Sequence, residues 1–213
     1  MSHIPILVKR EVQDHAIHFV LAFILGCIAS VIIYVFCKTV DSMGALVLTS
    51  GTLVFILGQL PCFMVLDAMS LARVQIAGDS RASVSAFICT LTPTRGQLFI
   101  AKWISGLVWI FLAVGPVLLT LALKGGQLGP YVPLIKPAMT GVIVLHVTGY
   151  AMGQQIGFLA NKTLILVVGA LFLCLLASLL VIKGLTMPCY ALMVVLTVAL
   201  SVRSWWAFHR MAL

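Results

Sequence analysis

Acidic side chains are scarce in this chain. Its 213 residues include five Asp and Glu against 13 Lys and Arg, and charged residues make up 8% of the total. Soluble domains carry roughly a quarter charged residues. Because 62% of the residues are hydrophobic, the chain has more apolar surface than a soluble fold of this length can bury, whereas a lipid bilayer can accommodate it. The composition therefore predicts an integral membrane protein.

The same shortage excludes several kinds of chemistry. A divalent metal site in a membrane usually needs several convergent carboxylates, and only Asp67 and Asp79 could plausibly meet. No Cys-x-x-Cys and no Gly-x-x-x-x-Gly-Lys-[Ser/Thr] occurs, so neither a cysteine metal framework nor a nucleotide-binding loop is expected. We therefore expect no catalytic residue, no metal and no cofactor on this chain.

What the chain has in abundance is long apolar stretches. Six of them are long enough to cross a bilayer, at about residues 17–37, 44–66, 98–123, 137–160, 164–182 and 187–206. Residues 4–16 precede them as an expected interfacial helix, with Ile4, Leu7, Val8 and Val12 on one face and Lys9, Arg10, Glu11 and Asp14 off it. The predicted fold is all-α, a polytopic membrane bundle of six transmembrane helices in a single domain, 1–213, with spans one and two within 17–69 and spans three to six within 98–206.

The basic residues orient this bundle. With the N-terminus in the cytoplasm, nine of the 13 Lys and Arg lie on the cytoplasmic side and four on the far side. This agrees with the positive-inside rule, so both termini are expected in the cytoplasm, at a bacterial inner membrane. The net charge of +8 is then explained by membrane orientation, and no nucleic-acid partner is expected.

One connector is more elaborate than the others. Residues 70–97 join the second and third spans as a polar, hydroxyl-rich cytoplasmic segment, whereas the other connectors are short. A solvated loop is the simplest interpretation, but the contrast favours a segment that docks a soluble partner. The candidate coupling residues are Gln75, Asp79, Arg81, Thr94 and Arg95.

Polar and small residues within the spans suggest two further roles. Gly149, Gly153 and Gly157 recur at every fourth position, which predicts a helix face that another backbone can approach closely. His146 and other scattered polar residues are candidates to line a translocation path, although a buried histidine more often has a structural role. The candidate path-lining residues are Thr52, Gln59, His146 and Gln154.

Three sequence features resemble the ABC-2 type permeases, the membrane subunits of one class of ABC exporters. The segment 7–14, Leu-Val-Lys-Arg-Glu-Val-Gln-Asp, resembles the elbow helix before the first span. The segment 91–102, Leu-Thr-Pro-Thr-Arg-Gly-Gln-Leu-Phe-Ile-Ala-Lys, is similar to the family's Leu-Ser-x-Pro-x-[Ser/Thr]-Arg stretch followed by Ala/Gly-Lys. The turn 157–162, Gly-Phe-Leu-Ala-Asn-Lys, resembles that between spans four and five.

This resemblance implies a transport function. The chain would be a permease that exports an amphiphilic or small substrate, pairs with a second copy or a homologous permease in the membrane lipid, and docks an ATP-binding subunit that carries ATP and Mg. Two other functions stay open. The chain could be a non-catalytic assembly subunit of a larger membrane complex, or an integral membrane lipid enzyme, against which the scarcity of acids argues.

Overall fold

The computed structural model describes residues 4–43, 64–76, 94–126, 132–158, 167, 169 and 187–210. The described elements are helices, with no strand among them, so the all-α prediction is confirmed for this part of the chain. They are α1 (Ile4–Asp14), α2 (Ala16–Met43), a helix over residues 64–76, α5 (Arg95–Lys124), α6 (Val132–Gly157) and α8 (Met187–Arg210).

Three of the described helices are long and apolar enough to cross a membrane, which indicates an integral membrane protein. Their apolar lengths are Ala16–Val35 of α2, Arg95–Lys124 of α5 and Pro188–Arg210 of α8. The predicted second and fifth spans lie almost entirely outside the described residues, and α6 corresponds to the fourth. Six transmembrane helices therefore stay a prediction.

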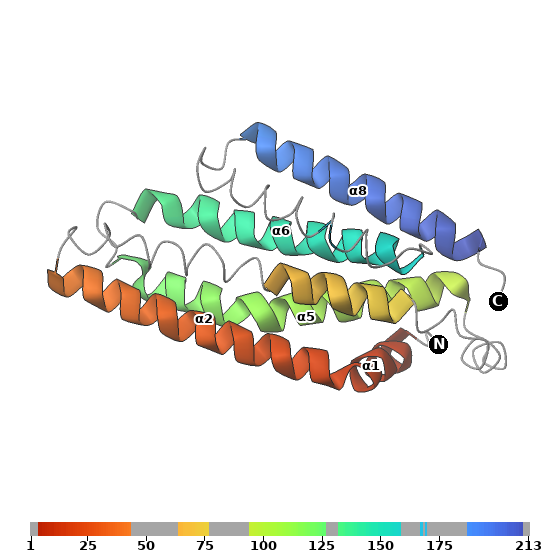
Figure 1. Cartoon of the computed structure of the whole chain (residues 1–213), viewed down its shortest axis with the longest axis horizontal. Helices are drawn as coiled ribbons and strands as arrows, with labels where there is room; N and C mark the ends of the chain where they lie inside the picture. Colours follow the sequence, from red (N-terminus) through yellow and green to blue (C-terminus); the bar gives the residue numbers. More distant parts are fainter. Residues whose placement is uncertain are drawn as a thin grey trace.

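The long helices lie alongside one another as an elongated bundle (Figure 1). In this bundle α5 packs against α2 and α1, and α6 packs against α8 and α5. The short helix α1 and the C-terminal end of α8 lie at the same end of the bundle (Figure 1).

The start of α5 is determined by a local capping motif. Thr94 has an extended backbone and accepts a hydrogen bond at Oγ1 from the Gln97 backbone N–H at 3.3 Å, while Gln97 Oε1 accepts from the Thr94 backbone N–H at 3.0 Å. This reciprocal pairing satisfies donors that an uncapped helix would leave free. The helix thus begins at Arg95, slightly before the predicted span, and carries the end of the coupling segment.

Close backbone contact holds α2 against α5. A Cβ atom added at Gly26 would lie 2.4 Å from the carbonyl oxygen of Ala113, a distance that real Cβ atoms do not show. Trp109 is fully buried beside this contact and donates from Nε1 to the His18 carbonyl oxygen at 3.1 Å. Small residues allow such approach between membrane helices, so α5 is fixed next to the junction of α1 and α2.

Candidate functional site

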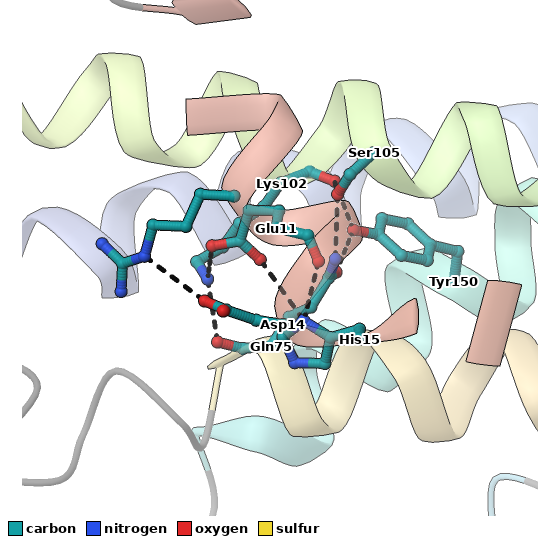
Figure 2. A network of polar contacts seen from close by, with 8 residues as sticks. Glu11, Asp14, His15, Gln75, Lys102, Ser105 and Tyr150 are labelled. Atoms are coloured by element: carbon teal, nitrogen blue, oxygen red, sulfur yellow. Dashed lines mark hydrogen bonds and ion pairs between the residues drawn. The ribbon is translucent and has the colours of Figure 1, made fainter. Parts of the chain in front are cut away.

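The side chain of Lys102 is buried near the start of α5. It is 1% exposed, and its Nζ donates to Glu11 Oε1 at 2.9 Å and to the Gln75 carbonyl oxygen at 2.9 Å (Figure 2). A buried ammonium group is costly unless it is paired and hydrogen-bonded. These contacts provide that pairing and connect α5 to α1 and to the end of the 64–76 helix.

A second set of hydrogen bonds extends the site to α6. Gln75 Nε2 donates to Ser105 Oγ at 2.8 Å, and the Tyr150 hydroxyl lies 2.6 Å from Gln75 Oε1 and 2.7 Å from the Lys102 carbonyl oxygen. Ser105 in turn donates to the same carbonyl oxygen at 2.8 Å. Gln75, Ser105 and Tyr150 are all at most 1% exposed. We call Glu11, Gln75, Lys102, Ser105 and Tyr150 the polar joint.

The polar joint has room for the tyrosine ring because α5 carries a glycine there. A Cβ atom at Gly106 would lie 2.2 Å from Cζ of Tyr150. The ring also meets Trp103 edge to face, with ring centroids 5.3 Å apart. The ring therefore packs against two residues of α5, and its hydroxyl is directed at Gln75 (Figure 2).

The position of Glu11 corrects one sequence-based prediction. Glu11 was expected off the apolar face of the interfacial helix, but the structure buries it together with Leu7, one turn earlier. The reason is the cation that faces it, because Lys102 lies on the surface against which α1 packs. The neighbouring Arg10 and Asp14 do lie outside, where they form an exposed pair at 3.3 Å.

A second polar contact lies at the junction of α1 and α2. His18 Nδ1 is 3.2 Å from Asp67 Oδ1, and Ser70 Oγ donates to the Asp67 carbonyl oxygen at 2.9 Å. Asp67 therefore faces a histidine of α2, while Asp79, the one other acid that it could plausibly meet, lies outside the described residues. This contact ties the 64–76 helix to α2, as Lys102 ties it to α5.

The predicted coupling residues divide into three groups. Gln75 is buried in the polar joint, so its side chain is not available to a soluble partner in this structure. Thr94 caps α5, and Arg95 Nη1 donates to the His209 carbonyl oxygen at 2.6 Å, which links the start of α5 to the end of α8. Asp79 and Arg81 lie outside the described residues.

The glycine face of α6 lies against the 64–76 helix. A Cβ atom at Gly153 would lie 2.4 Å from the Met69 carbonyl oxygen, and one at Gly157 would lie 2.6 Å from Cβ of Ile76. Gly149 is buried on the same helix. The structure thus places Gly153 and Gly157, two of the three predicted glycines, where no residue larger than glycine fits without a shift of its neighbours.

The predicted path-lining residues are only partly within the described structure. His146 and Gln154 of α6 are at most 1% exposed, whereas Thr52 and Gln59 lie outside the described residues. His146 Nδ1 is 2.7 Å from the Val142 carbonyl oxygen of its own helix. The side-chain amide of Gln154 has no hydrogen-bond partner among the described residues. Both residues are therefore inside the bundle.

Of the polar joint, sequence reasoning predicted only Gln75 as a functional residue. The charge distribution places Lys102 among the nine cytoplasmic cations, helical periodicity places Glu11 off the apolar face of α1, and no sequence pattern points to Tyr150. One signal was present: Lys102 stands among apolar residues in a chain with only five acids, and an intramembrane or buried lysine needs a partner. The sequence alone does not show which acid pairs with it.

No known protein family, curated protein or solved structure matches the chain. Within the described residues, no group of three or more His, Cys, Asp or Glu could hold a metal ion. The function therefore has to be argued from the sequence features and the polar joint.

Proposed function

We propose that the chain is the transmembrane permease subunit of an ABC-2 type exporter. It would export an amphiphilic or small substrate, with ATP and Mg bound by a separate ATP-binding subunit. The partner in the membrane is a second permease copy or a homologous permease. The bundle has six spans with both termini cytoplasmic, in a bacterial inner membrane. The sequence resemblance and the distribution of basic residues support this assignment.

The observation that carries the proposal is the polar joint. In the sequence, residues 77–93 connect the helix of residues 64–76, whose next-to-last residue is Gln75, to Thr94, which directly precedes α5. Lys102 holds the two flanking helices together and also holds α1. A displacement of the segment is therefore transmitted to two helices at once, which is what a coupling element between a soluble motor and a membrane bundle requires.

Each predicted coupling residue then has a distinct part. Asp79 and Arg81 provide the contacts to the ATP-binding subunit, with the guanidinium making paired hydrogen bonds to carboxylates or carbonyl oxygens. Gln75 transmits the movement from within the polar joint, and Thr94 keeps the start of α5 rigid. Arg95 connects that start to α8 through the His209 carbonyl oxygen.

The substrate path is proposed to pass along α6. His146 and Gln154 are buried polar residues on this helix, and Thr52 and Gln59 of the second predicted span would complete the lining. Few polar groups in a largely apolar path suit an amphiphilic substrate.

The test is co-purification with the ATP-binding subunit. The tagged wild-type chain, purified from its native membrane, is expected to retain a protein with ATPase activity. Arg81→Glu should release it, because the loss of one desolvated charged contact at an interface lowers affinity by about 30-fold to several thousand-fold. Arg81 is preferred to Arg95 for this purpose, since Arg95 also contacts α8.

Lys9→Glu is the matched control, because Lys9 is exposed on α1 and also reverses one positive charge. It should leave the ATP-binding subunit bound. An Arg81→Glu chain that keeps the subunit at wild-type stoichiometry would contradict the docking role. A wild-type chain that retains no ATPase would overturn the proposed function and favour an assembly subunit.

A further inference from the structure

The last turns of α8 present two arginines and a tryptophan on one face. Arg203, Trp206 and Arg210 are spaced by three and four residues, so their side chains lie above one another on the helix surface. All three are exposed, Trp206 by 57%. The guanidinium carbon of Arg210 lies 3.3 Å from the centroid of the Trp206 ring. This end of the helix thus combines positive charge with an amphipathic ring.

The same face continues along α8 as an apolar stripe. Leu192, Val195 and Val202 are 64%, 65% and 62% exposed, and they lie in helical register with Trp206. From residue 192 to residue 206 the helix rises about 21 Å at 1.5 Å per residue. One leaflet of the bilayer core is about 15 Å thick, so the stripe is long enough for one acyl chain to lie along it.

The charge at the top of this stripe is not neutralised within the described structure. The ion pairs of the described residues use Glu11, Asp14 and Asp67, and none of them involves an arginine of α8. Arg95 adds a further cation at the same end, where it contacts the His209 carbonyl oxygen. The end of α8 therefore attracts anions.

We propose that this face of α8 binds an anionic phospholipid. The Arg203 and Arg210 guanidinium groups hold the phosphate, since their planar forks match phosphate oxygens. The Trp206 ring lies at the headgroup level, where tryptophan is enriched in membrane proteins. One acyl chain follows Val202, Val195 and Leu192. A phospholipid accounts for the combination of a polar, cationic end and a purely apolar continuation. This proposal is independent of any ATP-binding subunit.

The test compares two phospholipids with the same acyl chains. Phosphatidylglycerol and phosphatidylcholine are titrated into the detergent-purified full chain, and bound lipid is counted by native mass spectrometry. The wild type should bind phosphatidylglycerol more tightly. Each arginine near an anionic headgroup contributes about fivefold in affinity, so Arg203→Gln with Arg210→Gln should lose about 25-fold and bind both lipids alike.

Lys124→Gln with Lys136→Gln is the matched control, because it removes two positive charges flanking the α5–α6 connection and leaves α8 unchanged. It should keep the preference. A second measurement uses phosphatidylglycerol brominated on the acyl carbons nearest the headgroup, where it quenches tryptophan at the headgroup level, and Trp206→Phe should lower this quenching. Equal binding of the two lipids by the wild type would overturn the proposal, and so would a preference that the double arginine variant retains. A cross-link between Val195→Cys residues of two chains would also overturn it, by showing a second copy on this face.

Discussion

Helix α5 makes two kinds of contact along its length. Against α2 it packs apolar and small groups, with Gly26 placed at the Ala113 carbonyl oxygen and Trp109 buried alongside. Against α1 and the 64–76 helix it presents a buried ammonium, Lys102, with a carboxylate and a carbonyl oxygen as partners. The first contact depends on shape and the second on charge.

The difference has consequences for movement. In a bilayer, lipid tails are as apolar as the side chains, so burial of apolar groups does not by itself drive helices together. Apolar helix contacts are instead stabilised by many small van der Waals interactions. A buried ion pair has one favourable geometry and is strongly unfavourable when one partner is removed. The polar joint therefore depends on one arrangement of its charged groups, whereas the contact between α2 and α5 depends on the fit of small and apolar groups. This difference is the basis for the proposal that the joint has the coupling role.

The largest effect is expected from removing the buried cation. Lys102→Met leaves Glu11 buried without its ammonium partner, which should cost about 3–5 kcal/mol of stability. The measurement is thermal or denaturant unfolding of the purified chain in detergent. Lys9→Met is the control, since Lys9 is exposed on α1, and it should change stability by less than about 0.5 kcal/mol. Equal effects of the two substitutions would remove the distinction between the two kinds of contact.

A smaller effect is expected where packing depends on shape. In Gly153→Ala the new Cβ meets the Met69 carbonyl oxygen at 2.4 Å, so the helices must separate, at a cost of about 1–3 kcal/mol. Gly126→Ala is the control, because no atom lies within 4 Å of its added Cβ, and it should be neutral or slightly stabilising. The same unfolding assay measures both. If Gly153→Ala unfolds at the same temperature as the wild type, the glycine face of α6 does not pack closely against the 64–76 helix.

The two kinds of contact also differ in how far the sequence predicts them. Apolar length predicted the all-helical class and the positions of α2, α5 and α8, because bilayer thickness sets the length of a span. The spacing of Gly153 and Gly157 indicated a close-packing face, and the structure places both against the 64–76 helix. Such features depend on residues close together in the sequence, so helical periodicity is enough to predict them.

The polar joint is not local. Glu11 and Lys102 are 91 residues apart. The sequence around either residue does not show that the other one is its partner. Helical periodicity assigned Glu11 to the exposed face, because Lys9, Arg10 and Asp14 surround it. Burial of Glu11 follows from the position of Lys102, which only the packed bundle determines. Tyr150 is likewise recognisable as part of the site only once Gly106 is placed beneath its ring.

The most direct test of the polar joint is a double-mutant cycle on its ion pair. Glu11→Leu, Lys102→Met and the double replacement are compared with the wild type by unfolding in detergent. Each single variant removes one half of the ion pair and leaves the opposite charge buried, whereas the double variant removes both charges. We predict that the double variant is more stable than the sum of the single losses implies, by at least about 2 kcal/mol. Additive losses would show that Glu11 and Lys102 act independently, and would contradict the assignment of this pair as the link between α1 and α5.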